Sequence, residues 1–264
     1  IEQHIADTNF GMFAQDIEAS RAIARIKTKY HYPSHIVAST GKNQKERVLE
    51  CADILDGSLR LAASVQSLDP VVLTNVKRQN ISAQKLIEVT KISNALDANT
   101  YSEVILAMPG DTKEKHFNTV MQLADADLKL IPMFTLMILD GSELGTDASR
   151  EHWTMQTKFR VVPRCFGAYD FRGNEVLSAD VEEVCVATDS LSLEDYYECR
   201  SFALTMGVFY QDRVMYELYR FLSNFDIKPS NIIPVLHERR LGFSNGIADL
   251  FESYDEATRT ELWD

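Results

Sequence analysis

The segment Ser102-Glu103-Val104-Ile105-Leu106-Ala107-Met108-Pro109-Gly110-Asp111-Thr112 decides the fold that this sequence predicts. Its apolar run over residues 102–107 is typical of a buried strand. Pro109 and Gly110 indicate a tight turn, and Asp111 or Thr112 is suited to cap a helix that runs to about Ala124. Strand, turn and helix together form one unit of an α/β fold.

The same unit recurs on both sides of this segment. Four more apolar runs are typical of strands, and each is followed by polar or small residues: 3–6, 35–38, 59–65 and 129–139. Amphipathic helices are predicted between them at 14–29, 44–55 and 82–95. Five strand–helix units in a row imply a parallel sheet with right-handed crossovers. No G-x-G-x-x-G follows the first strand, which favours a barrel over a doubly wound sheet.

The pattern changes beyond about residue 150. Residues 158–162 and 183–187 are predicted to be strands joined by a loop over 166–174. Ser192 opens a helical tail, with further helices expected at 214–222 and 247–254. We therefore predict a partial (β/α) TIM-like barrel over residues 1–190, followed by a helical C-terminal extension over 191–264.

Composition narrows the class of protein. The 264 residues carry a formal net charge of -12, which makes nucleic acid a poor general partner. No apolar run reaches the roughly 18 residues that a membrane-spanning helix needs. The four cysteines lie too far apart in sequence for a CxxC or CxxxCxxC site, the histidines form no HExxH, and we assign no metal ligand. Idle thiols of this kind fit the reducing cytoplasm.

Polar side chains at the ends of the predicted strands are candidates for binding a small polar ligand. Asp7 and Asn9 are two residues apart, so they can share one face, and the same holds for Ser64 and Gln66. A carboxylate such as Asp7 can hold an ammonium group, and Gln66 can both donate and accept. The alternative is that these residues merely cap strands and start turns.

Three charged residues are candidates for binding substrate. Glu103 lies inside an apolar strand, where a carboxylate needs a partner. The candidate partners of this carboxylate are the cations Lys77, Arg78, Arg160 and Arg164. Arg160 and Arg164 could clamp a carboxylate or phosphate, although a surface salt bridge is the default for either one. The backbone amides of the turn at Pro109 and Gly110 could receive an anion or the edge of a ligand.

Five strings stand in order at the spacing of barrel strands. Together they resemble the class of radical S-adenosylmethionine (radical SAM) proteins that contain a cobalamin-binding domain. The strings are Ala6-Asp7-Thr8-Asn9-Phe10-Gly11-Met12-Phe13, Ser39-Thr40-Gly41-Lys42-Asn43, Ser64-Val65-Gln66-Ser67-Leu68-Asp69-Pro70, the opening segment Ser102–Thr112, and Phe159-Arg160-Val161-Val162-Pro163-Arg164-Cys165-Phe166-Gly167.

The resemblance implies a fold and a set of cofactors. The family has a partial barrel whose first strand leads into a CxxxCxxC loop that holds a 4Fe-4S cluster. S-adenosylmethionine (SAM) binds that cluster, and its reductive cleavage gives a 5′-deoxyadenosyl radical that attacks a small-molecule substrate. We expect this chain to begin at the family's second strand. The cluster ligands and a cobalamin domain would then lie upstream in the same polypeptide, and a flavodoxin or ferredoxin would supply electrons.

The resemblance also implies roles for individual residues. Asp7 and Asn9 match the element that holds the SAM amino group, although the family more often has Gly-Gly-Glu there. Ser64 and Gln66 match residues near the ribose and carboxylate, and a basic residue such as Lys77 or Arg78 often meets that carboxylate. The residues that match the adenine-lining segments are Val104, Ile105, Pro109, Gly110 and 136–139. The chain alone is expected not to cleave SAM, because it lacks the cluster cysteines.

Two other functions stay open on the sequence. A cluster-independent barrel enzyme could act on a small anionic metabolite, with Glu103 or Asp7 as base and the arginines as clamps. A non-catalytic binding or assembly module could use the helical tail as its interface. Neither the substrate nor the reaction type follows from the sequence, because barrels of one family share their activation chemistry and differ in substrate-binding loops.

Overall fold

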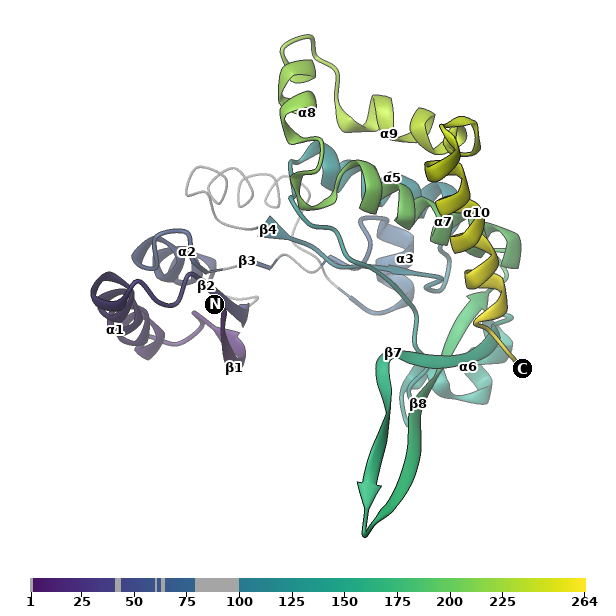
Figure 1. Cartoon of the computed structure of the whole chain (residues 1–264), viewed down its shortest axis with the longest axis horizontal. Coiled ribbons are helices and arrows are strands. Elements are labelled where there is room, and N and C mark those ends of the chain that lie inside the picture. Colours follow the sequence, from purple (N-terminus) through teal and green to yellow (C-terminus); the bar gives the residue numbers. More distant parts are fainter. Residues whose placement is uncertain (1, 41–43, 60, 63–64, 79–99) are drawn as a thin grey trace. The chain divides into compact units, whose positions relative to one another are not determined.

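The computed structural model describes residues 2–40, 44–59, 61–62, 65–78 and 100–264 of the chain. These residues form a mixed α/β structure that divides into two compact units (Figure 1). Unit 1 comprises residues up to Gln66 together with Ile81–Glu103 and Leu123–Pro132, and unit 2 comprises the remainder. Ser64 and the helix predicted at 82–95 lie outside the described residues.

The strands of unit 1 pair in parallel, as the sequence predicts. Strand β1 pairs with β2, and β3 pairs with β4. Single parallel bridges join Ile36 to Leu59 and Tyr101 to Leu130, so neighbouring strands follow the order of the chain. The elements of unit 1 are β1 (Glu2–Phe10), α1 (Gln15–Tyr30), β2 (His35–Thr40), α2 (Lys45–Ile54), β3 (Leu61–Ala62) and β4 (Thr100–Tyr101).

The turn after β1 is fixed by a buried carboxylate. Asp16, near the start of α1, accepts hydrogen bonds from the backbone N–H groups of Gly11 and Phe13, both at 2.9 Å. Gly11 has φ +87°, and a Cβ there would lie 2.8 Å from Val48 Cγ2 of α2. Because only glycine combines this φ with this close approach, the turn packs directly on α2. The core of unit 1 contains Phe10, Ile36, Ala38, Val48, Cys51, Ala52, Leu55 and Leu59.

Strand β6 connects parallel and antiparallel pairing in unit 2. It pairs in parallel with β5, and the next residues pair with β8: Cys185 N–H donates to Leu136 O (2.9 Å) and Ile138 N–H to Glu183 O (2.8 Å). Strand β8 pairs antiparallel with β7. The strands are β5 (Val104–Leu106), β6 (Met133–Thr135), β7 (Gln156–Phe171) and β8 (Asn174–Ala187).

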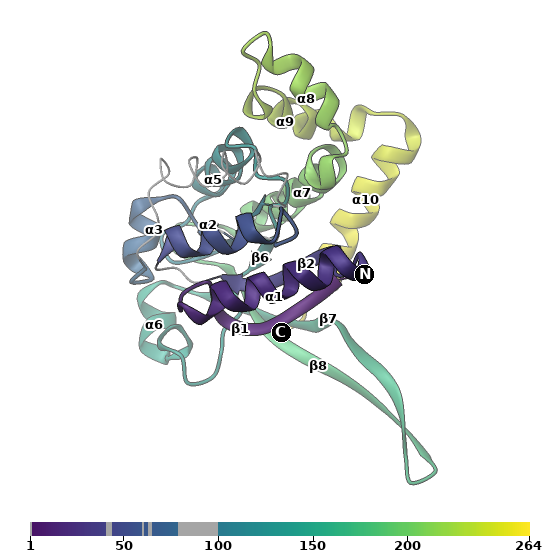
Figure 2. The same ribbon diagram turned by 90° about the vertical axis from the view of Figure 1, so that its left-hand side faces the viewer.

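The loop predicted at 166–174 is wrong. Strands β7 and β8 continue to Phe171 and Asn174, joined by Arg172 and Gly173, which have φ 55° and 80°. Two successive positive φ angles make a hairpin turn whose twist matches that of the strands. The resulting arm projects from the rest of unit 2 in both views (Figure 1; Figure 2). Large apolar side chains exposed on the arm include Phe166, Tyr169, Phe171, Val176 and Leu177.

Helices cover this sheet, and α7 makes the principal core contact. Tyr196 and Cys199 of α7 pack with Leu106 of β5, Val184 of β8 and Leu136, which directly follows β6. Within the described residues, no helix is long and apolar enough to cross a membrane. The helices are α3 (Pro70–Asn75), α5 (Lys113–Asp125, of which the part up to Gln122 belongs to unit 2), η1 (Glu143–Gly145), α6 (Asp147–His152), α7 (Leu193–Phe209), η2 (Gln211–Arg213), α8 (Tyr216–Ser223), α9 (Pro229–Glu238), η3 (Arg240–Gly242) and α10 (Asn245–Thr260).

The helical C-terminal region is confirmed, and a buried polar network holds part of it together. His237 of α9 is 3% exposed. Its Nδ1 lies 2.7 Å from Thr205 Oγ1 and its Nε2 lies 3.0 Å from Glu198 Oε1, both on α7. Arg240 donates to Glu198 Oε2 at 2.9 Å. The hydrogen bond from His237 and the charge of Arg240 lower the pKa of Glu198 to about 2.

Several predicted strands are longer than those observed, and the barrel itself stays a prediction. Only three residues of the run 102–107 and three of the run 129–139 form regular strands. The apolar stretches continue as irregular backbone that is buried only in part; Ala107 is buried there and has φ 67°. The domain boundary between residues 190 and 191 also stays a prediction; Leu191 and Tyr196 share a core cluster with Val186.

We predict that Glu198→Gln lowers the free energy of unfolding by about 1–2 kcal/mol at pH 7, since it removes a charge-assisted network. The folded pKa of Glu198 lies below its ordinary value of 4.5, so its contribution is present above about pH 4.5 and is lost as the pH falls toward 2. Urea unfolding at pH 7 and pH 3 measures this. The control is Glu252→Gln, on exposed α10. The role of Glu198 would be contradicted if the difference in unfolding free energy between wild type and Glu198→Gln were the same at both pH values, or if Glu252→Gln produced the same difference.

Candidate functional site

The turn between β5 and α5 is the segment on which the predicted site depends. Asp111 N–H donates to Met108 O (2.9 Å) and closes the turn. Gly110 has φ +80°, and a Cβ added there would lie 2.5 Å from Asn75 Nδ2. The position therefore requires glycine both for its backbone conformation and for the close approach of α3.

Three consecutive carbonyl groups of this turn accept hydrogen bonds from three different segments. Asn75 Nδ2 of α3 donates to Pro109 O (3.1 Å), and Lys115 Nζ of α5 donates to Gly110 O (2.8 Å). Ser190 Oγ, in the loop before α7, donates to Asp111 O (2.7 Å). The path of the turn is thus set by one side chain of the following helix and by two, Asn75 and Ser190, that are remote in sequence.

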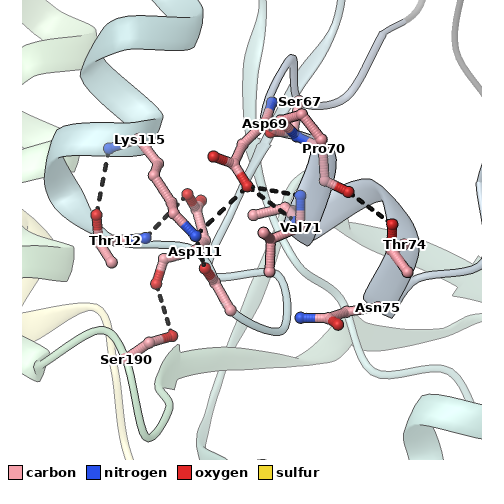
Figure 3. A network of polar contacts seen from close by, with 12 residues as sticks. Ser67, Asp69, Pro70, Val71, Thr74, Asn75, Asp111, Thr112, Lys115 and Ser190 are labelled. Atoms are coloured by element: carbon pink, nitrogen blue, oxygen red, sulfur yellow. Dashed lines mark hydrogen bonds and ion pairs between the residues drawn. The ribbon is translucent and has the colours of Figure 1, made fainter.

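The same lysine connects the turn to the start of α3. Asp69 caps this helix by accepting from the backbone N–H groups of Val71 (2.9 Å) and Val72 (3.0 Å). Lys115 Nζ also lies 3.4 Å from Asp69 Oδ1. Figure 3 shows the Lys115 side chain between the cap of α3 and the turn. Asn75 and Ser190 lie on the side of the turn that faces away from this cap. Helices α3 and α5 therefore hold the turn jointly.

A buried acid follows the turn. Asp111 is 1% exposed, accepts from Thr112 N–H (3.0 Å) and lies 3.7 Å from His116 Nδ1, which is also buried. Burial and the carboxylate of Asp111 both raise the pKa of the Cys199 thiol on α7. This thiol is therefore protonated and inert at neutral pH.

A cavity of about 640 Å³ adjoins this turn network within unit 2. Asn75 belongs to both, since its side chain holds Pro109 and also lines the cavity. Met137 and Leu139, which follow β6, supply an apolar surface. The remaining lining residues come from the end of α3, from η1 and from α6: Val76, Lys77, Ser142, Glu143, Leu144, Ala148, Ser149, His152 and Trp153.

Helix α6 forms a firmly held wall of the cavity. Arg150 donates to both carboxylate oxygens of Glu183 on β8, at 2.5 and 2.8 Å. These hydrogen bonds lower the pKa of Glu183. Thr146 caps α6 by accepting from Ser149 N–H (3.3 Å), and Asp189 N–H donates to Trp153 O (2.9 Å). The His152 and Trp153 side chains therefore project from a fixed backbone.

Four of the residues predicted to bind the cofactor lie in unit 2, namely Arg78, Ile105, Pro109 and Gly110. Pro109 and Gly110 form the turn, and Ile105 packs against the core just before it. Arg78 follows α3, where its backbone N–H donates to Leu73 O (2.8 Å). Lys77, beside it, reaches Glu143 at the rim of the cavity.

Of the other described candidates, Asp7, Asn9, Gln66 and Glu103 lie in unit 1. Asp7 Oδ1 accepts from Asn9 N–H (2.7 Å) in the last part of β1, where the pairing with β2 is irregular. Gln66 N–H donates to Glu103 O (2.8 Å), which places these two residues side by side. The Glu103 carboxylate accepts from the Tyr101 hydroxyl (3.2 Å), a partner that sequence reasoning did not consider.

The two candidate arginines are in different settings. Arg160 is 9% exposed and donates to Glu182 (2.6 Å), with Glu261 at 3.5 Å, at the base of the β7–β8 arm. It thus makes a salt bridge, but a buried one rather than the surface salt bridge expected by default. Arg164 lies on the exposed side of the arm, at an irregularity in the pairing of β7 with β8. The roles of both residues in substrate binding stay predictions.

No cluster of metal ligands is found among the described residues. Groups of three or more His, Cys, Asp or Glu suited to a metal are absent from that part of the chain. Cys51, Cys185 and Cys199 are buried, Cys165 is exposed, and all four are free. Burial raises the pKa of Cys185 to about 12. These four cysteines do not fit a 4Fe-4S cluster, which needs thiolates that converge.

Sequence reasoning missed most of the residues that position the turn. Asp69 followed by Pro70 is a recognisable start of a helix, because Asp caps and Pro suits the first helical position. Asn75, Lys115 and Ser190 carried no such signal. Their hydrogen bonds join segments that only the folded chain brings together. His152 and Trp153 were likewise not identified as lining a cavity.

Two curated relatives match the chain in sequence. The cobalamin-dependent radical SAM methyltransferase TokK of Streptomyces tokunonensis is 28% identical over 163 residues, which cover 58% of this chain and 23% of that protein. The 2-(S-pantetheinyl)-carbapenam-3-carboxylate methyltransferase of Streptantibioticus cattleyicolor is 24% identical over 205 residues, which cover 75% of this chain and 29% of that protein. The chain thus spans about a quarter of the length of these relatives.

Solved structures of one further methyltransferase align with the chain at lower similarity. They are of TsrM from Kitasatospora setae, one with tryptophan substrate and a SAM analog and one with cobalamin and a [4Fe-4S] cluster. Identities are 11% and 12%, TM-scores are 0.45 and 0.46, and each alignment covers 98% of this chain and 52% of that one. No protein-family model matches the chain. The sequence matches confirm the relationship to the cobalamin class of radical SAM proteins.

We predict that Gly110→Ala lowers the free energy of unfolding by about 1–3 kcal/mol, because alanine meets both the positive φ and Asn75. In an Asn75→Ala background the steric part disappears, so the cost of Gly110→Ala falls to about 1 kcal/mol. A double-mutant cycle by urea unfolding measures this coupling. Equal costs of Gly110→Ala in both backgrounds would show that Asn75 does not restrain the turn; Gly141→Ala, with φ +78° and open space, is the control.

Proposed function

Given its sequence relationship to cobalamin-dependent radical SAM methyltransferases, we propose that this chain forms part of a radical SAM enzyme of that class. In this proposal it holds SAM and shapes the pocket of a small-molecule methyl acceptor. The observation that carries the proposal is the pair of sequence matches, which extend over 58% and 75% of the chain. The parent enzyme would use a 4Fe-4S cluster and cobalamin that other parts of the polypeptide bind.

The proposed scaffold is a partial (β/α) barrel. Three parallel strand pairs support it, namely β1–β2, β3–β4 and β5–β6. In barrels of this kind, ligands bind at the carboxyl ends of the strands. The turns that follow β1 and β5 are each fixed by buried side chains, Asp16 in one case and Asn75 in the other. Such fixed turns suit a site that must hold a cofactor in one orientation.

The residues proposed to bind SAM are those that the sequence indicated. Asp7 and Asn9 would hold the amino group, Ser64 and Gln66 the ribose, and Arg78 the carboxylate. Ile105, Pro109 and Gly110 would line the adenine. The chemistry of these groups fits SAM, which carries a cation, a carboxylate and a flat base. SAM, when bound, supplies the methyl group and the reactive fragment; this chain's residues bind and orient it and exclude water.

The four cysteines of this chain do not fit a 4Fe-4S cluster, which needs thiolates that converge. The 264-residue chain by itself is proposed to bind SAM without cleaving it.

We predict that calorimetric titration of SAM into the chain gives saturable binding. Arg78→Met should weaken it about tenfold, since one charge-assisted hydrogen bond contributes roughly 1.5 kcal/mol. Arg220→Met, on exposed α8, removes the same charge and should leave the affinity unchanged. A titration without heat or saturation would reject the proposal and favour a module that binds no small molecule.

We also predict that the chain, incubated with iron, sulfide, dithionite and SAM, produces no 5′-deoxyadenosine above a protein-free control. The reason is that its four cysteines neither follow a CxxxCxxC spacing nor form a ligand group in the structure. Chromatography with mass detection measures the product. Formation of 5′-deoxyadenosine would show that the chain assembles a cluster by itself.

A further inference from the structure

The cavity beside the turn network has an apolar surface and a charged rim. Met137 and Leu139 line it and are 44% and 55% exposed, which is unusual for large apolar side chains next to a core. The half-buried indole of Trp153 lines it from α6. Lys77 and Glu143 form an ion pair at the cavity and are 71% and 68% exposed. A ligand that fills the space would cover apolar surface while it meets both charges.

Three other polar side chains around the cavity already have hydrogen-bond partners in the protein, and the His152 ring packs edge-on against Trp153. Asn75 donates to Pro109 O, Ser142 Oγ to Leu139 O (2.7 Å) and Ser149 Oγ to Glu143 O (2.7 Å). These bonds shape the wall and leave little capacity for a ligand. The opposite charges of Lys77 and Glu143 are therefore the groups best able to recognise one.

The ion pair can be opened at little cost. Exposed salt bridges contribute about 0–1 kcal/mol, because water solvates both partners well. A ligand with only a negative charge would pair with Lys77 and leave Glu143 unpaired; a ligand with only a positive charge would do the reverse. A ligand with both charges on neighbouring atoms replaces one solvated ion pair by two that its own body shields from water.

We propose that this cavity binds an α-amino carboxylate with an apolar side chain. Its carboxylate pairs with Lys77, its ammonium with Glu143, and its side chain packs against Met137, Leu139 and Trp153. This inference rests on the proposed function and deepens it, since such a molecule, or a larger compound with this group, is the acceptor substrate. SAM carries the same zwitterionic group, so the test separates the two sources.

The test uses the fluorescence of Trp153. The chain has two tryptophans, and Trp263→Phe removes the other one. L-phenylalanine is the probe, and it should change the Trp153 emission saturably with a Kd of about 1 mM or below. N-acetyl-L-phenylalanine lacks the ammonium and L-phenylalaninamide lacks the carboxylate; each should bind at least about tenfold more weakly.

Variants of the rim identify the charges. Lys77→Gln and Glu143→Gln should each weaken L-phenylalanine binding about tenfold. The double exchange Lys77→Glu with Glu143→Lys should restore most of it, because a zwitterion can bind in the reverse orientation. The matched control is Lys158→Gln, which breaks an ion pair with Asp264 elsewhere in the unit and should not alter binding. Circular dichroism verifies that each variant is folded.

The outcomes separate this inference from the proposed function. Absence of a saturable change, or equal binding of all three probes, would overturn the inference even where SAM binds in the calorimeter. Displacement of L-phenylalanine by SAM, with loss of SAM binding in Lys77→Gln, would also overturn it and assign the cavity to SAM. Binding of L-phenylalanine to a chain that does not bind SAM would support the zwitterion site and reject the radical SAM assignment.

Discussion

The carbonyl groups of Pro109, Gly110 and Asp111 accept hydrogen bonds from Asn75, Lys115 and Ser190, and much of unit 2 is organised around them. Buried carbonyl groups need partners, and here side chains supply what a regular strand or helix would otherwise provide. Helix α3, helix α5 and the loop before α7 are fixed relative to β5 as a result. One side of the cavity is fixed as well, because Asn75 and Lys77 at the end of α3 form it.

Strand β6 and the backbone that follows it fix the other side of the cavity. The first residues of β6 pair in parallel with β5, and the backbone beyond it pairs with β8 of the hairpin. This change of partner exposes Met137 and Leu139 while Leu136 and Ile138 enter the core. Arg150 then connects α6 to Glu183 of β8. The position of Trp153 thus depends on the hairpin, although the outer part of the arm is far along the chain from the residues that line the cavity.

Much of the fold was predictable because it depends on local pattern. Helices α1, α2 and α5 begin and end within a residue or two of their predicted bounds, since apolar periodicity and caps act over a few residues. The hairpin turn is missed because Arg172-Gly173 is a weaker turn signal than Asn-Gly or Asp-Gly, so the sequence predicts a loop over 166–174 where the strands in fact continue. For the site, the turn at Pro109 and Gly110 was identified, whereas the residues that hold it were not.

The sequence by itself determined the parallel strand pairs, the helical C-terminal region, the relationship to cobalamin-class radical SAM proteins and the lack of cluster cysteines. Each of these depends on residues close together in the chain or on their order along it. Only the tertiary structure decided that Asn75 and Ser190 meet Lys115 at one turn, that Arg160 is paired with Glu182, and that Lys77 is paired with Glu143 at the rim of a cavity. Apart from that of Lys115, these contacts join residues far apart in sequence, and a side chain's partner there depends on packing rather than on local pattern.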